Sequence, residues 1–283
     1  MIKDHVNRRD WIQRMAGVAA LAGLGEYPRP GISSPPAKIA RPGLQLYTLR
    51  SEMEKSVDAT LAKVAQLGFK EMEFAGYFKK TPAQIAALLQ ANGLTAPSAH
   101  VDRNAIGNGW PELLDNAARM GHQWVVVAYI PEADRASADS YKRLAGEFNT
   151  AAAAAKQRGI SFAYHNHDFE FAPLGPTNGH AVLLAECDRS LVQFELDLFW
   201  ITKARQDAAA YVARHPGRFP LVHVKDMMAD GSMTEVGSGT IDFQKIFTAA
   251  RGGIKHFFVE HDNPKLPFES VEKSVQALRR LSA

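Results

Sequence analysis

The chain has 283 residues, of which 46% are hydrophobic and 22% charged, so it is long enough to build one large hydrophobic core. Its single cysteine, Cys187, excludes an intramolecular disulfide and a cysteine-rich zinc or iron–sulfur site. The formal net charge is +3, but residues 1–41 hold seven of the 33 Lys/Arg and three of the 30 Asp/Glu, so the remainder carries a net charge of −1. A nearly neutral domain lacks the basic stripe that phosphate backbones require, and no nucleic-acid partner is expected.

The first 41 residues resemble a twin-arginine export leader followed by a linker. Residues 7–13 read NRRDWIQ, with paired arginines, a spacer, an aromatic and an aliphatic residue, and an apolar run follows at 15–24. That run is shorter than the roughly 20 apolar residues of a membrane-spanning helix. We therefore expect export to the periplasm by the twin-arginine route, with no stable membrane insertion after processing. The alternative is an amphipathic first helix of the domain.

From Gly43 onward, short apolar strands alternate with helical stretches. Strands are predicted at 43–47, 70–74, 94–100, 124–129, 160–165, 191–197, 221–225 and 256–260. Helices are predicted at 57–67, 82–92, 111–120, 140–158, 178–187, 208–214, 242–251 and 268–281, with an irregular loop at 231–239. Eight such units predict a single-domain (β/α)8 TIM barrel over residues 43–283. A doubly wound sheet is the alternative, but residues 46–50 lack the glycine-rich turn that it needs.

Polar side chains collect where the predicted strands end, and the strand starts carry nothing comparable. In chain order these side chains are Gln45, Tyr47, Glu73, His100, His165, His167, Glu195, Asp197, His223, Lys225, Glu260, His261 and Asp262. Because TIM-barrel active sites lie at the C-terminal ends of the strands, the sequence predicts a functional site at this rim.

Several of these strand ends lie in motifs that resemble one family. Residues 162–171 (FAYHNHDFEF), 197–200 (DLFW), 223–226 (HVKD) and 259–262 (VEHD) are similar to the motifs of the xylose-isomerase-like barrel family, often labelled sugar phosphate isomerase/epimerase. Residues 44–50 and 235–239 are also similar, and the resemblance covers 43–283. It implies a divalent metal at the rim, held by Glu, Asp, His and Glu from strands five to eight. Asp197, His223 and Glu260 match the last three ligands.

The fifth strand departs from the usual pattern, because His165 stands where the family has Glu. His167 is the other candidate on the same strand face, since side chains alternate along a strand. A ligand set of two imidazoles and two carboxylates suits Mn²⁺, Co²⁺, Zn²⁺ or Fe²⁺ better than Ca²⁺ or Mg²⁺. We therefore predict a divalent metal site formed by His165, Asp197, His223 and Glu260.

Each predicted ligand also has an ordinary structural interpretation. Asp197 could cap the following helix, His223 could be a core histidine, and Glu260 could pair with Lys225. Glu195 lies deeper and could orient a neighbouring side chain. Four such residues at four consecutive strand ends nevertheless favour the metal site.

A metal on a sugar carbonyl and its neighbouring hydroxyl acidifies the adjacent C–H, because it stabilises the enediolate that forms. The predicted function is accordingly a periplasmic, metal-dependent sugar isomerase/epimerase. Glu260 is expected to act as metal ligand and as base. His167 or Glu170 is expected to transfer a proton from the other side of the sugar, and Lys225 to stabilise the developing negative charge. The predicted substrate contacts are Gln45, Tyr47, His100 and Trp200.

The sequence is compatible with three alternative functions. If the enediolate intermediate instead lost a β-substituent, the protein would be a 3-keto-glycoside lyase or hydratase. A metal-dependent phosphodiester nuclease and a catalytically silent sugar-binding protein are the others, and the near-neutral domain weighs against the nuclease. The expected partner is a small carbohydrate, and a non-phosphorylated one if the protein is exported. A homo-oligomer is compatible with the sequence.

Overall fold

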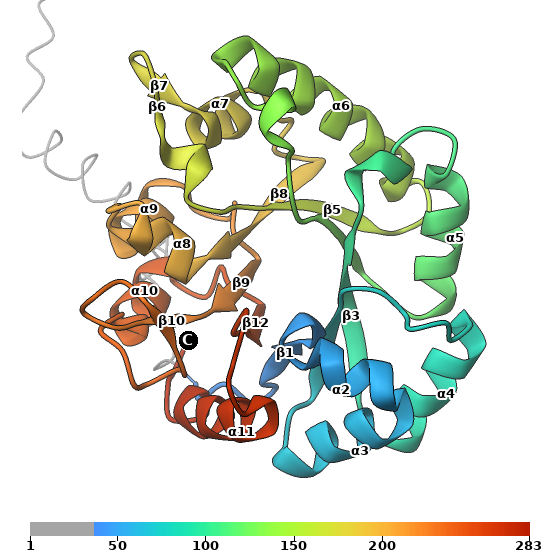
Figure 1. Cartoon of the computed structure of the whole chain (residues 1–283). Coiled ribbons are helices and arrows are strands. Elements are labelled where there is room, and N and C mark those ends of the chain that lie inside the picture. The colour runs from blue at the N-terminus through green and yellow to red at the C-terminus, as the bar shows by residue number, and fades with distance from the viewer. Residues whose placement is uncertain (1–36) are drawn as a thin grey trace, which may run out of the picture. The chain divides into compact units, whose positions relative to one another are not determined.

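In a computed structural model, which describes residues 37–283, eight parallel strands close into a barrel. The strands are β1 (Gly43–Gln45), β2 (Glu71–Phe74), β3 (Thr95–Val101), β4 (Trp124–Val127), β5 (Ser161–His165), β8 (Val192–Asp197), β9 (Leu221–Val224) and β12 (His256–Val259). Around the barrel they follow the order β1-β12-β9-β8-β5-β4-β3-β2. The predicted (β/α)8 barrel is therefore confirmed, and Figure 1 shows the helices surrounding it.

The main helices follow the strands that the alternation predicts. They are α2 (Arg50–Lys55), α3 (Val57–Leu67), α4 (Pro82–Ala91), α5 (Trp110–Arg119), α6 (Ala138–Lys156), α7 (Gly179–Glu186), α8 (Leu198–Lys203), α9 (Ala208–Arg214), α10 (Phe243–Ala250) and α11 (Pro267–Leu278). Local signals set their bounds. Ser56 caps the start of α3, Gly68 ends it with a φ of 96°, and Thr81 and Gln84 form a capping box at α4.

Some local elements differ from the predicted ones. β1 ends at Gln45 because residues Leu46–Leu49 wind into a 3-10 helix, η1, that leads directly into α2. α8 starts immediately after β8, since Asp197 ends the strand and caps the helix. The loop predicted at 231–239 contains β11 (Met233–Thr234), which pairs with β10 (Asp226–Met227) in a short hairpin. A second hairpin joins β6 (Pro173–Leu174) to β7 (Thr177–Asn178).

The inside of the barrel is layered, because alternate strand residues face inward. Val126, Ala163, Leu221 and Phe258 form a small apolar cluster of their own, separate from the large core that includes the helices. Two residues further along β5 and β9, the next inward positions are His165 and His223. The apolar layer thus supports a polar layer at the C-terminal ends of the strands.

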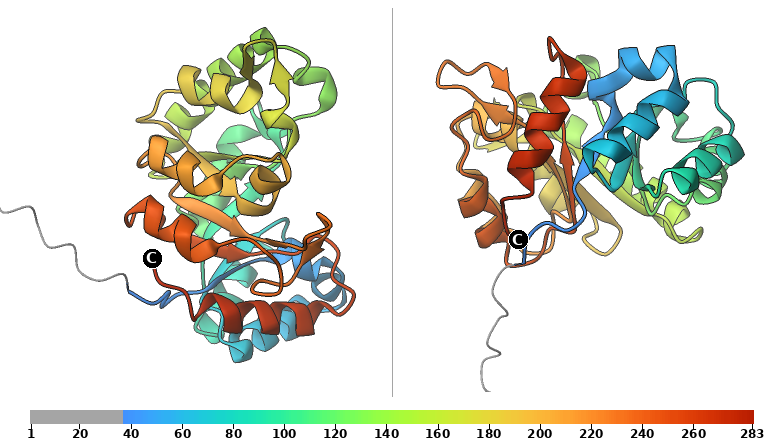
Figure 2. Two further views of the ribbon diagram at one scale, coloured as in Figure 1. Left: turned by 90° about the vertical axis from the view of Figure 1, so that its left-hand side faces the viewer. Right: turned by 90° about the horizontal axis from the view of Figure 1, so that it is seen from below.

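Residues 37–42 pack against the barrel and extend the compact part slightly beyond the predicted start at 43. Ile39 is buried, its N–H donates to the carbonyl of Leu281, and Lys38 bridges to Ser282. Figure 2 shows the C-terminus beside this first described segment. The predicted leader falls on residues 1–36, outside the described residues, apart from its last few positions. Within residues 37–283, no helix is both long and apolar enough to cross a membrane.

Candidate metal centre and active site

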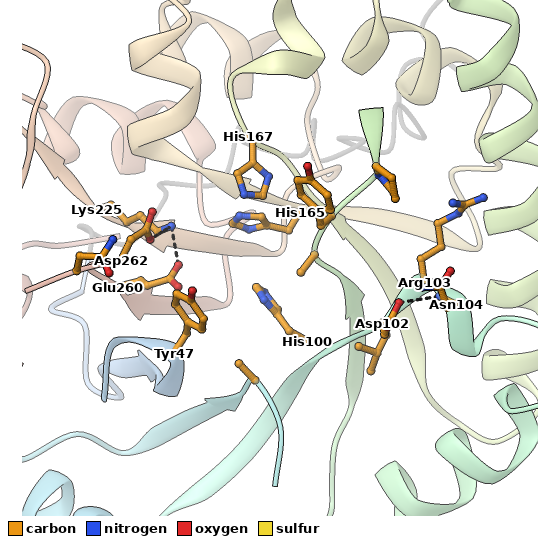
Figure 3. A pocket seen from close by; sticks show the side chains of 16 residues that line it. Tyr47, His100, Asp102, Arg103, Asn104, His165, His167, Lys225, Glu260 and Asp262 are labelled. Carbon is orange, nitrogen blue, oxygen red and sulfur yellow. Dashed lines mark hydrogen bonds and ion pairs between the residues drawn. The ribbon is translucent and has the colours of Figure 1, made fainter. Parts of the chain in front are cut away.

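A cavity of about 700 Å³ opens at the C-terminal ends of the barrel strands. Figure 3 shows the side chains that line it. Of the predicted site residues, the structure brings six to its wall: Tyr47, His100, His165, His167, Lys225 and Glu260. Asp197 and His223 lie just beneath the cavity and are fully buried. Gln45, Glu170 and Trp200 do not line it.

Three imidazoles converge on one carboxylate oxygen below the cavity. Glu195 Oε2 lies 2.8 Å from His100 Nε2, 3.2 Å from His165 Nδ1 and 3.0 Å from His223 Nε2. The rings of His165 and His223 are 4.5 Å apart, and that of His100 stacks on His223 at 5.1 Å. Burial alone would raise the pKa of Glu195, but the surrounding imidazoles hold it well below its usual range. Glu195 is therefore an anion that orients three rings.

A second buried carboxylate supports this arrangement from β2. Glu73 Oε2 lies 2.6 Å from His223 Nε2 and accepts a hydrogen bond of 2.8 Å from Gln45 Nε2. Its other oxygen accepts a hydrogen bond of 2.5 Å from Ser98 Oγ. The Gln45 side-chain oxygen accepts from the backbone N–H of Tyr47. Gln45 thus lies within the barrel as a support for Glu73, away from the cavity that a substrate would enter.

Two buried polar atoms on the other side of the imidazoles make no well-oriented hydrogen bond within residues 37–283: Asp197 Oδ2 and His223 Nδ1. Asp197 Oδ1 accepts from the N–H of Trp200 and caps α8, so the ordinary interpretation of Asp197 holds for one of its oxygens. His223 Nδ1 lies 2.6 Å from Glu260 Oε2, and His165 Nε2 lies 3.8 Å from Asp197 Oδ2. Such orphaned groups are costly unless something binds them.

The side-chain atoms on the side of the imidazoles away from Glu195, which we call the outward set, fit a divalent metal. Asp197, His223 and Glu260 each offer one ligand atom, and these atoms all lie within 4.8 Å of one another. A second group of the same kind consists of His100, His165, Glu195 and His223, but there the nitrogens already share Glu195 Oε2. A ligand histidine usually gives its other nitrogen to a carboxylate, as His223 does to Glu195 and Glu73. The geometry favours the outward set, with the inner carboxylates as its support.

Lys225 lies among the same carboxylates. Its Nζ is 3.0 Å from Asp197 Oδ2, 2.7 Å from Glu260 Oε2 and 2.9 Å from Asp262 Oδ1. Burial opposes the charge on Lys225, but these carboxylates raise its pKa well above the usual value. Lys225 and His223 in turn hold the pKa of Glu260 well below its usual range, against the effect of burial. Lys225 and Glu260 therefore form a charged pair at the cavity wall.

His167 lies on the wall above His165, and its loop is held from below by Glu170. The His167 ring stacks on Phe169 with an interplanar angle of 7°, and burial lowers its pKa to about 3, so the ring is neutral. Its backbone N–H donates to Glu170 Oε2 at 2.8 Å. Glu170 is fully buried and also accepts from the hydroxyl of Tyr164. The Glu170 carboxylate therefore does not line the cavity itself. It affects the cavity by fixing the position of His167.

Trp200 is half-buried beside this wall. Its ring centre is 5.4 Å from that of His167 and 4.9 Å from that of Phe199. Its Nε1 has no hydrogen-bond partner among the described residues.

The role of Glu73 and Ser98 was not predicted from the sequence. Glu73 was recognised only as a polar strand end, and Ser98 was not singled out. One signal was present, because Glu71 and Glu73 put two acids on the inward face of a short strand, where a charged group needs a partner.

The closed barrel, with a His, Asp and Glu cluster at the C-terminal ends of its strands, defines a TIM barrel with a candidate metal site. Residues 61–281 match the family model described as xylose isomerase-like TIM barrel, and the chain belongs to this family. This confirms the resemblance seen in the motifs. No curated protein matches the chain.

Three solved structures illustrate the similarity. A sugar phosphate isomerase/epimerase from Parabacteroides distasonis is 26% identical, with a TM-score of 0.76, over 89% of this chain and 98% of that one. A D-allulose 3-epimerase from Methylomonas sp. is 17% identical, with a TM-score of 0.66, over 87% and 99%. The IOLI protein, solved with a bound zinc atom, is 14% identical, with a TM-score of 0.67, over 85% and 95%. At these identities, the D-allulose 3-epimerase and the IOLI protein show only that the fold is shared.

Proposed function

We propose that this protein is a divalent-metal-dependent sugar isomerase/epimerase that abstracts a proton next to a carbonyl. One observation carries the proposal: two buried polar atoms, Asp197 Oδ2 and His223 Nδ1, make no well-oriented hydrogen bond and lie with Glu260 Oε2 at the base of the cavity. Family membership and the sugar isomerases and epimerases of the same fold support it.

In this proposal the metal ligands are His165, Asp197, His223 and Glu260. The donor set of two nitrogens and two oxygens favours Zn²⁺, Mn²⁺, Co²⁺ or Fe²⁺. A divalent ion held there would polarise the sugar carbonyl and so lower the barrier to loss of the neighbouring proton. Glu195 and Glu73 hold the imidazoles with their ligand nitrogens turned outward.

The reacting proton is proposed to pass to Glu260, whose carboxylate is ionised and lies at the cavity wall. Lys225, 2.7 Å from Glu260 Oε2, would stabilise the negative charge that develops on the substrate oxygen. His167 is neutral and could exchange a proton or a hydrogen bond with a hydroxyl on the other side of the sugar. Glu170 acts on this step by positioning His167.

Tyr47 and His100, which line the cavity, are proposed to contact the sugar, whereas Gln45 acts through Glu73 and Trp200 packs behind His167. Export to the periplasm is likewise our proposal and rests on the sequence of residues 7–13. It is tested by fractionating cells that produce the wild-type chain and a variant with Arg8 and Arg9 replaced by lysine. Loss of the periplasmic protein in the variant alone is the expected result. Equal periplasmic amounts of both would refute the twin-arginine route, and absence of the wild-type chain from the periplasm would refute export.

Exchange of carbon-bound hydrogen with solvent tests the proposed reaction directly. The zinc- or manganese-loaded protein is incubated in D₂O with ketoses, ketose phosphates and 3-keto-glycosides, and proton NMR follows the carbons beside the carbonyl. We expect one proton signal to be lost as the epimer or isomer appears, and Glu260→Gln to abolish the exchange. A 3-keto-glycoside that instead eliminates its substituent would identify a lyase. No exchange at full metal occupancy with any of these substrates would refute the proposal.

A further inference from the structure

We propose that the cavity accepts an uncharged saccharide of at least two sugar residues and discriminates against sugar phosphates. This inference rests on the proposed function, because it names the substrate class of the same site. Three independent features carry it: the pairing of the cations around the cavity, two exposed aromatic rings on its wall, and the extent of the cavity itself.

The cations that line the cavity are already engaged by carboxylates. Lys225 contacts three of them within 3.0 Å. Arg103 donates twice to Glu147, at 3.1 and 3.0 Å, and once to Asp134 at 2.5 Å. A phosphate dianion needs several unengaged donors or a positive charge. Among the described residues that line this cavity, the charge of Lys225 is already offset by three carboxylates and that of Arg103 by two, so neither cation presents a net positive charge to a phosphate.

Backbone donors at the far side of the cavity are engaged in the same way. Asp102 starts a short 3-10 helix, η2 (Arg103–Ala105), and its carboxylate accepts the N–H of Asn104 at 2.8 Å. Helix starts attract phosphate through such N–H groups, but here a carboxylate already occupies the position. Asp102 and Asp262 both line the cavity and add negative charge that would repel a phosphate.

The cavity wall presents two aromatic faces. Four large hydrophobic side chains are exposed in residues 37–283, and the two aromatic ones, Tyr47 at 42% and Tyr129 at 50%, both line this cavity. Exposed aromatic rings in a cavity commonly mark a binding surface, and their flat apolar faces suit the C–H faces of sugars.

Both rings are held in place by their neighbours. The guanidinium of Arg50 lies 4.2 Å from the Tyr47 ring centre and is anchored to the carbonyl of Asp262 at 2.7 Å. Tyr129 stands perpendicular to the stacked rings of His167 and Phe169, 5.8 Å from each. Rigid rings lose little entropy on binding, which favours stacking of a neutral ligand.

The cavity is longer than the reaction centre requires. In Figure 3, Lys225, Glu260 and Asp262 lie on one side of the opening, Asp102, Arg103 and Asn104 on the other, and His100 between them. Its volume of about 700 Å³ is well within the range of roughly 300–1,000 Å³ that holds drug-sized ligands. A sugar that reacts beside Glu260 therefore leaves room for a second ring toward Asp102 and Asn104, whose polar groups could bind its hydroxyls.

Binding to the zinc-loaded full chain tests the inference with defined probes. Calorimetry and saturation-transfer NMR compare sucrose, maltose and cellobiose with glucose, fructose and fructose 6-phosphate. We expect at least one disaccharide to bind about tenfold or more tightly than its component monosaccharides, as an added stacking contact predicts. Fructose 6-phosphate should bind no more tightly than fructose. Tighter binding of the phosphate, or no preference for any disaccharide, would overturn the inference.

Matched variants of Tyr129 separate stacking from a structural effect. Tyr129→Ala should weaken the preferred disaccharide about three- to tenfold and leave monosaccharide binding unchanged, whereas Tyr129→Phe should stay within about twofold of wild type. Equal loss for both sugar sizes, or no loss, would contradict the role of Tyr129. If deuterium from the solvent exchanges into monosaccharides but no disaccharide binds more tightly than its components, this inference alone is overturned. Disaccharide binding without exchange into any sugar would overturn the proposed function alone.

Discussion

Replacing Glu195 with glutamine keeps the shape of the side chain but removes the charge on which three imidazoles converge. In the wild type, Glu195 Oε2 lies within 3.2 Å of nitrogens from His100, His165 and His223. It thereby holds His165 Nε2 and His223 Nδ1 toward Asp197 and Glu260. A glutamine amide presents N–H groups as well as an oxygen, so at least one imidazole must change its tautomer or its orientation.

The expected cost follows from the number and kind of these contacts. A hydrogen bond to a charged group is worth about 1.5–3 kcal/mol, against about 0.5–1.5 for a neutral pair. The three wild-type contacts share one oxygen, so their energies cannot be added. We therefore expect Glu195→Gln to weaken metal binding by about 10–100-fold, the usual effect of removing a carboxylate that orients a metal ligand. This corresponds to about 1.4–2.8 kcal/mol of binding free energy.

Competition with a chelator of known zinc affinity measures this loss. Glu71→Gln is the matched control, because Glu71 is also a buried glutamate that contacts a histidine, 2.8 Å from His256 Nδ1, but at the start of β2, at the opposite end of the barrel. The control should lower the melting temperature and leave zinc affinity unchanged. An affinity for Glu195→Gln within about twofold of wild type would refute the orienting role. A loss far beyond about 100-fold would instead make Glu195 a metal ligand.

Three further changes probe the remaining groups. Lys225→Met removes an ammonium from among the proposed metal-binding carboxylates, so zinc should bind about tenfold or more tightly by chelator competition, while turnover falls. His167→Ala should lower kcat about 100-fold or more, and Glu170→Gln less than about tenfold, since only His167 lines the cavity. Burial lowers the pKa of His180 to about 3 from 6.5, so the unfolded chain binds the extra proton in this interval. His180 should therefore contribute about 2 kcal/mol to the change in the free energy of unfolding between pH 7.5 and 5, and His180→Asn should remove this contribution from the pH dependence measured in urea titrations.

The sequence predicted the barrel and the strand ends well, because strand and helix periodicities repeat eight times and the strand ends are marked by polar residues. It did not predict the depth of each side chain along the barrel axis. Alternation shows that Gln45 faces inward, but only the pairing of Gln45 with Glu73 shows that both lie below the cavity. Register between strands comes from closure of the barrel, to which distant segments contribute, and no local pattern encodes it.

The same limit applies to His167 and Glu170. Their spacing predicted two polar groups near the fifth strand, and Glu170 was expected to reach the substrate. In the structure a short 3-10 helix, η4 (Phe169–Phe171), turns the chain, and Glu170 points away from the cavity to Tyr164, which packs on Phe148 of α6. Whether a polar residue after a strand faces a cavity depends on such a turn, and the turn depends on a hydrogen bond to a tyrosine within the barrel wall.

Asp197 shows why the structural and the metal-binding interpretations need not compete. Its Oδ1 caps α8, whereas its Oδ2 faces Lys225 at 3.0 Å without a well-oriented hydrogen bond. Burial raises the pKa of Asp197 to about 6, because the buried site disfavours the ionised form of this carboxylate. Lys225 supplies one positive charge to three carboxylates, those of Asp197, Glu260 and Asp262. A divalent cation beside His223 would supply the missing charge, lower the pKa of Asp197 and satisfy both orphaned atoms at once.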